Sequence, residues 1–121
     1  MITKLDTSFT NIVSFEFTDK IYKEDFETTV FPAIKDLKEK QDEINMVYII
    51  NTDLKNFTTE AWLQDALLGL KNLTKFNRVA IVTASDNVQT FTELFSKVIP
   101  GEFKGFEMSE REKAMKWVAN G

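Results

Sequence analysis

The sequence predicts an α/β fold in which helices pack against a sheet that begins with an antiparallel hairpin. Three features of the chain support this prediction. Apolar and polar residues alternate near the start, two unbroken apolar runs, MVYII and VAIV, occur further on, and segments with helical periodicity separate the predicted strands. Buried strands that alternate with helices are typical of a sheet covered by helices.

The elements of the first half follow from these patterns. The hairpin is expected over residues 1–6 and 11–18, because residues 13–17 of the second segment alternate between apolar and polar side chains. A first helix is expected over 23–40, where apolar residues recur at helical spacing. Pro32 lies inside this helix and should kink it, since proline removes a backbone hydrogen bond. The segment 44–51 is predicted to be a central strand buried on both faces.

The second half continues the alternation. A second helix is expected from Thr58, a good N-cap residue, to about Lys75. The segment 78–83, RVAIVT, predicts another strand buried on both faces. A third helix is expected over 87–99, with Asp86 as its N-cap.

The chain closes with a short strand that ends at Phe106 and a final helix. Ser109 and Glu112 match a capping box, which predicts the start of that helix. No linker, repeat or low-complexity segment interrupts the order of elements. One domain over residues 1–121 is therefore expected.

The composition excludes several classes of function. The formal net charge is -4 and the lysines and arginines are scattered among more numerous acids, which argues against nucleic-acid binding. The chain has no cysteine and no histidine, and its acids show no ligand spacing, so no metal site or cofactor is expected. No apolar run is long enough to cross a bilayer, so a cytoplasmic protein is expected.

Acids and hydroxyls follow the two predicted central strands, where ligands of α/β sheets usually bind. Asp53 and Thr83 match two positions of a receiver-type phosphoryl site. The remaining positions are not matched, because the first strand ends in a single acid, Asp6, and no Lys-Pro pair follows the last strand. Asp53 is therefore interpreted as a turn residue and Asp86 as a helix cap.

Several short motifs keep a characteristic order along the chain. They are MITKLD, EDF followed by Pro32, AWLQDALLGLKNL, FNRVAIV and AMKWV. In this order the chain resembles the SpoIIAA-like group of STAS domains, the fold of anti-anti-sigma factors, which is also compared with CRAL-TRIO lipid carriers. The resemblance implies a four- to five-stranded mixed sheet flanked by about four helices, in a bacterial regulatory domain without enzymatic activity.

The resemblance also implies a site of phosphorylation. Anti-anti-sigma factors are switched by phosphorylation of a serine at the start of the helix after the third strand. Here the matching positions hold Thr58 and Thr59, and the usual Asp-Ser pair is missing. These two threonines are the candidate phosphoacceptors.

The second predicted helix carries the candidate binding residues. Helical geometry places an apolar arc on one side, formed by Trp62, Leu63, Ala66, Leu67 and Leu70. Leu68 falls on the polar side with Lys71 and Lys75, where it would contact a membrane or a partner. The alternative is a core-facing helix with one incidental exposed leucine.

Two functional hypotheses remain from the sequence. The first is a small non-enzymatic binding domain in which this helix covers an apolar small molecule or lipid, with peripheral membrane contact. The second is a protein–protein interaction module of the anti-anti-sigma type that binds a protein partner, or forms a homodimer, through the same helix. An enzyme is less favoured, since the commonest general base and the cysteine nucleophile are absent.

Overall fold

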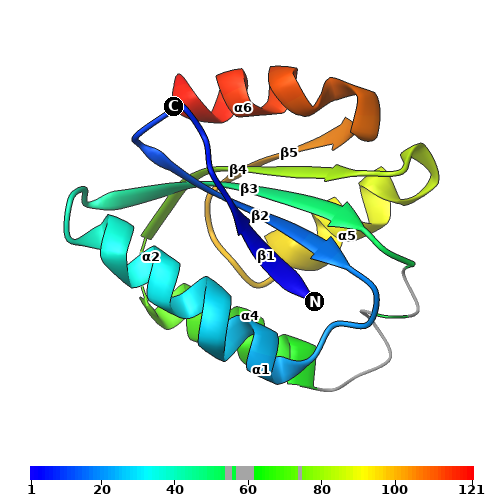
Figure 1. Cartoon of the computed structure of the whole chain (residues 1–121), viewed down its shortest axis with the longest axis horizontal. Coiled ribbons are helices and arrows are strands. Elements are labelled where there is room, and N and C mark those ends of the chain that lie inside the picture. Colours follow the sequence, from blue (N-terminus) through cyan, green and yellow to red (C-terminus); the bar gives the residue numbers. More distant parts are fainter. Residues whose placement is uncertain (54–55, 57–61, 74) are drawn as a thin grey trace.

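The computed structural model describes residues 1–53, 56, 62–73 and 75–121, with the backbone alone at 62–64 and 85. Within these residues five strands form a sheet in chain order (Figure 1). The strands are β1 (Ile2–Leu5), β2 (Ile12–Thr18), β3 (Glu43–Asn51), β4 (Lys75–Thr83) and β5 (Glu102–Glu107). β1 and β2 are antiparallel, and the other neighbours are parallel. The predicted mixed sheet with an opening hairpin is confirmed.

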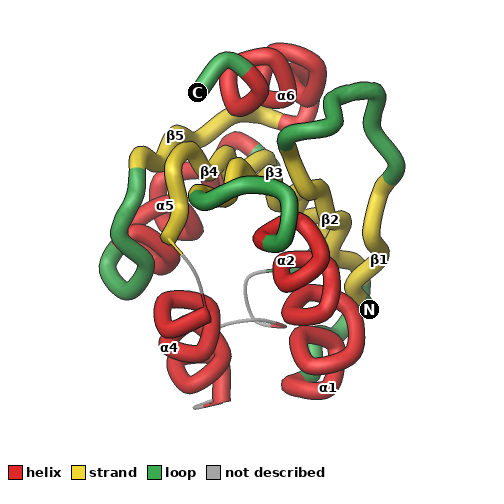
Figure 2. Tube along the Cα trace, turned by 90° about the vertical axis from the view of Figure 1, so that its left-hand side faces the viewer, coloured by secondary structure: helices red, strands yellow, loops and turns green. Residues whose placement is uncertain are grey.

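Helices cover both faces of the sheet. The described helices are α1 (Lys23–Asp25), α2 (Phe31–Lys38), α4 (Trp62–Leu73), α5 (Val88–Ser96) and α6 (Arg111–Ala119). Right-handed crossovers between successive parallel strands place the connecting helices on one face. Figures 1 and 2 show α1, α2, α4 and α5 on that face and α6 on the other.

Two apolar layers explain why the central strands read as unbroken apolar runs. Alternate residues of β3 point to opposite faces, so Tyr48 lies in the layer beneath α1, α2, α4 and α5, whereas Val47 lies beneath α6. Both side chains are fully buried. The predicted burial of this strand on both faces is confirmed.

The kink expected at Pro32 takes the form of a π-helical stretch, Phe26–Val30, between α1 and α2. Its widened turn closes with a hydrogen bond from the Phe31 amide to the Phe26 carbonyl. Pro32 has no amide hydrogen, and its ring would collide with the carbonyl of Thr28 in a regular α-helix. A wider turn just before the proline relieves this collision.

Several predicted helix ends are wrong, and short hydrogen-bonded turns account for the starts of α5 and α6. The first predicted helix ends at Lys38 rather than Lys40, and the third ends at Ser96 rather than Ile99. The final helix begins after a 3₁₀ turn, Met108–Glu110, where Glu110 rather than Glu112 accepts a backbone hydrogen bond, from the Glu107 amide at 3.0 Å. Asp86 lies inside another 3₁₀ turn, Ser85–Asn87, and α5 has no side-chain cap. Lys75 is the first residue of β4, since α4 ends at Leu73.

Candidate functional site

The inner side of α4 belongs to the core. Ala66, Leu67 and Leu70 are 5%, 1% and 0% exposed and pack in the layer between the helices and the sheet. Trp62 and Leu63, the other members of the predicted apolar arc, have side chains outside the described residues. The backbone of α4 includes both positions.

The outer side of α4 presents Leu68, which is 42% exposed. Lys71 is also exposed on this helix, and Lys75 is exposed at the start of β4. The predicted contact residues therefore come from two elements rather than from one helix. Leu68 is the large apolar side chain that the described part of α4 leaves at the surface.

A crevice lies at the edge of α4, where this helix meets α1, the π-helical stretch and α2. Its volume is about 150 Å³, and its lining residues are Lys23, Phe26, Glu27, Phe31, Asp65, Ala66 and Gly69. A Cβ atom on Gly69 would lie 3.1 Å from Phe31 Cζ, so the glycine lets the aromatic ring pack against the helix. Phe26 is fully buried, so this part of the crevice wall belongs to the hydrophobic core.

Tyr48 lies at the centre of the apolar layer that α4 helps to cover. Its ring centroid is 5.1 Å from that of Phe17, 5.2 Å from that of Phe95 and 6.0 Å from that of Phe15. The Tyr48 hydroxyl is buried and has no hydrogen-bond partner among the residues that the structure describes. Burial raises the pKa of this phenol well above its ordinary value, so the hydroxyl stays neutral.

Our sequence predictions did not include Tyr48. The signal that could have indicated Tyr48 is its position in the apolar segment 44–51, which was predicted to be buried on both faces. A tyrosine at such a position buries a hydroxyl, and buried hydroxyls normally have a partner. Whether a partner is present depends on side-chain placement, which periodicity does not predict.

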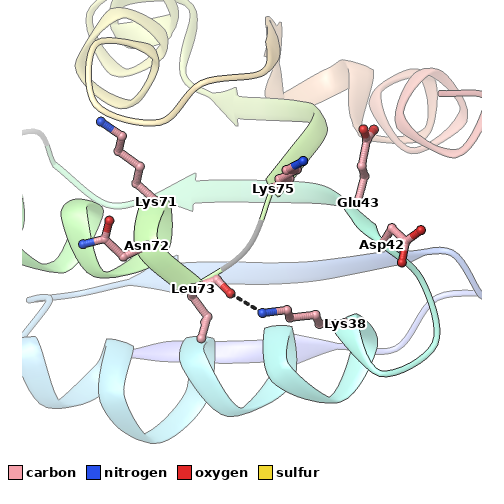
Figure 3. Close-up of a pocket in the computed structure, with 7 residues that line it drawn as sticks. All are labelled: Lys38, Asp42, Glu43, Lys71, Asn72, Leu73 and Lys75. Carbon is pink, nitrogen blue, oxygen red and sulfur yellow. Dashed lines mark hydrogen bonds between the residues drawn. The ribbon is translucent and has the colours of Figure 1, made fainter.

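A second, more polar groove lies at the carboxyl end of α4 (Figure 3). Its volume is about 630 Å³, and its lining residues are Lys38, Asp42, Glu43, Lys71, Asn72, Leu73 and Lys75. Lys38 Nζ donates a hydrogen bond to the Leu73 carbonyl at 2.7 Å, which ties α2 to the end of α4. Lys71 and Lys75 therefore share a groove with Asp42 and Glu43, and charges of both signs face it.

The carboxyl ends of β3 and β4 border another pocket, of about 240 Å³. Asp53 lines it, and the Asp53 carbonyl accepts a hydrogen bond from the Asn56 amide at 3.0 Å, as in a turn. Thr83 Oγ1 donates to the Ile50 carbonyl at 2.9 Å, so this hydroxyl joins two strands. Asp86 is not among the lining residues described, and Thr58 and Thr59 lie outside the described residues.

The described residues contain no group of three or more acids that could hold a metal ion. None of the described helices is long and apolar enough to span a bilayer. The side chains that line the hollows described above carry apolar groups, carboxylates, amides, a hydroxyl and lysine amines.

A mixed five-stranded sheet with an opening hairpin and helices on both faces defines a small STAS-like domain. A family model described as SpoIIAA-like matches residues 12–119, and the chain belongs to this family. Its members are generally non-enzymatic domains, and they commonly interact with proteins.

One similar solved structure is an uncharacterized protein of the DUF3478 family with a SpoIIAA-like fold from Shewanella loihica. The two chains are 25% identical, the TM-score is 0.61, and the similarity covers 98% of this chain and 92% of the other. No curated protein matches this chain. The resemblance stated from the sequence is confirmed at the level of family and fold.

Proposed function

We propose that this protein is a binding domain that holds an apolar ligand between α4 and the sheet. The observation that supports it is the crevice of about 150 Å³ at the edge of α4, with Phe26 and Phe31 in its wall. Ligand sites are concave and mostly apolar, with few polar groups. This crevice is small, but it adjoins an extensive apolar layer.

The packing around Gly69 supports entry of the ligand at this edge. Because residue 69 is glycine, it places no side chain between the backbone of α4 and the ring of Phe31. Behind it, Phe26 packs edge to face on Phe17 with a centroid distance of 5.8 Å. The crevice holds about five groups of the size of a water molecule, since one water occupies about 30 Å³. A longer ligand therefore requires an outward shift of α4.

Native mass spectrometry of freshly purified protein tests this proposal. We expect an added mass on the folded chain that organic solvent releases as a fatty acid, lipid or similar apolar molecule. The variant Gly69→Leu fills the crevice and should lose the added mass. Leu68→Ala, on the outer side of the same helix, is the matched control and should keep it. A bare wild-type chain that also takes up no added dodecanol would contradict the proposal.

A second candidate function is an interaction module that uses the outer side of α4. The observation in its favour is Leu68, which is 42% exposed in a family whose domains commonly interact with proteins. A leucine beside Lys71 is also suited to an anionic membrane surface. We expect Leu68→Glu to abolish any binding to phosphatidylglycerol vesicles in co-sedimentation. If the wild type does not bind these vesicles, the outer side of α4 is not a membrane-binding surface.

Self-association is measured separately, because a homodimer would use the same residue. Sedimentation equilibrium of the wild type and of Leu68→Glu reports the mass of each in solution. A dimeric wild type with a monomeric variant supports a second copy of the chain as the partner. A monomeric wild type would contradict the homodimer hypothesis.

A further inference from the structure

The hydroxyl of Tyr48 is a polar group in a layer that is otherwise apolar along this strand. The residues of β3 that face α1, α2, α4 and α5 are Ile44, Met46, Tyr48 and Ile50. Tyr48 is 0% exposed, and its hydroxyl has no hydrogen-bond partner among the described residues. Three phenylalanine rings lie within 6.0 Å of its ring, centroid to centroid.

This hydroxyl adds no hydrogen bond to the fold among the described residues. A buried polar group without a partner destabilises the folded state, and nearly all such groups in proteins are paired. A phenylalanine at this position would make the same ring contacts without that cost. The Ser14 and Thr18 hydroxyls also lack a described partner, but they alternate with Phe15 and Phe17 and so face the α6 side of the sheet.

The aromatic residues connect this hydroxyl to the crevice at the edge of α4. Phe26 lines the crevice and packs edge to face on Phe17, at 5.8 Å between ring centroids. Phe17 in turn packs on Tyr48 at 5.1 Å. The crevice is also lined by three exposed charged residues, Lys23, Glu27 and Asp65. A molecule that passes them and displaces Phe26 therefore meets the apolar rings of Phe17 and Tyr48.

We infer that the ligand is an apolar molecule with one uncharged hydrogen-bonding group, such as a long-chain alcohol, amide or ester, and that this group pairs with the Tyr48 hydroxyl. The inference rests on the proposed function and names the chemical class of its ligand. An uncharged phenol serves both as donor and as acceptor.

Charge balance in the core excludes an ionised head group at this position. The polar residues that the structure describes as buried are Ser14, Asn45 and Thr83, besides Tyr48 itself, and no lysine or arginine is among them. A carboxylate beside Tyr48 would have no counter-charge, and burial of an unpaired charge is strongly unfavourable. A fatty acid would therefore bind in its protonated form only.

Dodecanol and dodecane provide a matched pair of probes, since they differ by one hydroxyl. Displacement of the neutral fluorophore N-phenyl-1-naphthylamine reports the affinity of each for the wild type and for Tyr48→Phe. We expect the wild type to prefer dodecanol by about threefold to tenfold, the effect of one hydrogen bond. Tyr48→Phe should lose this preference, keep the affinity for dodecane and melt at a higher temperature without ligand.

Fluorine NMR gives a second measurement that needs no substitution of Tyr48. The chain has two tyrosines, so 3-fluorotyrosine labelling yields one signal from Tyr48 and one from Tyr22, which is 51% exposed. Dodecanol should shift the Tyr48 signal more than dodecane does, and the Tyr22 signal should not move.

The outcomes separate the inference from the proposed function. If neither probe displaces the fluorophore from the wild type, the proposed apolar site is absent. If both bind equally well to the wild type and to Tyr48→Phe, the site exists but the inference is wrong. An ordered water on the Tyr48 hydroxyl in a crystal structure with bound dodecanol would also overturn it, because that water would be the missing partner.

Discussion

At the scale of single residues, Leu68 and Leu70 lie two positions apart on α4, but substitutions at the two positions should affect the free energy of unfolding very differently. Leu70 is 0% exposed, so Leu70→Ala removes buried methyl groups and should lower the free energy of unfolding by ~2 to 5 kcal/mol. Leu68 is 42% exposed, and Leu68→Glu should stay within about 0.5 kcal/mol. Urea denaturation measures both. A large loss for Leu68→Glu would place this side chain in an interface between copies of the chain.

Two glycines give a second residue-scale prediction. A Cβ on Gly105 would overlap Val88 Cγ1 and lie 2.8 Å from Thr92 Oγ1, both on α5. Gly105→Ala should therefore cost about 1–3 kcal/mol through overpacking. In Gly69→Ala the new methyl meets Phe31 alone, at 3.1 Å, and helix propensity offsets the contact by up to about 1 kcal/mol. Thermal melts should show a clear loss for the first variant and little change for the second.

At the scale of elements, the start of α6 has a predictable response to acid. The hydrogen bond from the Glu107 amide, helped by the charge of Lys113 at 3.6 Å, lowers the pKa of the Glu110 carboxyl. A lowered pKa stabilises the folded state above the ordinary pKa of about 4.3, and this stability is lost as the pH falls through the folded-state value.

The variant Glu110→Gln tests this response, because glutamine still accepts the Glu107 hydrogen bond but does not titrate. From pH 5 to pH 3 the melting temperature of the wild type should fall more steeply than that of Glu110→Gln. Glu112→Gln, in the first turn of the same helix, is the control and should follow the wild type. Parallel curves for all three proteins would show that Glu110 does not contribute to acid sensitivity.

The strands and the longer helices were predictable from the sequence, but several of their ends, the π-helical stretch and the two 3₁₀ turns were not. Apolar periodicity depends on many residues and therefore indicated the strands and helices, including the outward position of Leu68. Helix ends depend on one or two competing hydrogen bonds, so Glu110 rather than Glu112 accepts the backbone bond at the start of α6. The groove that joins Asp42 and Lys71 brings together residues far apart in the chain, and no local pattern predicts that contact.

At the scale of the whole molecule, the sheet divides the interior into two layers that share the same strands. Ile34 lies in the layer beneath α1, α2, α4 and α5, and Val118 lies in the layer beneath α6. Both side chains are fully buried. Because every central strand contributes to both layers, loss of either layer exposes the other face of the same sheet. The chain should therefore unfold in a single transition, as small domains usually do.

Pairs of substitutions test this organisation. Ile34→Val should cost about 0.5–1.5 kcal/mol, and Val118→Ala should cost roughly 2 kcal/mol, since each buried methylene contributes about 0.8 kcal/mol before the cavity term. The sheet separates the two sites, so the costs should add to within about 0.5 kcal/mol in the double variant.

Phe17→Leu and Phe26→Leu form the contrasting pair, because these rings pack edge to face at 5.8 Å and should show coupling of about 0.5–3 kcal/mol. Urea unfolding followed by circular dichroism and by tryptophan fluorescence measures both pairs. Strong coupling between Ile34→Val and Val118→Ala would contradict the separation of the two layers by the sheet. Two separate unfolding transitions would contradict the prediction that the two layers unfold together.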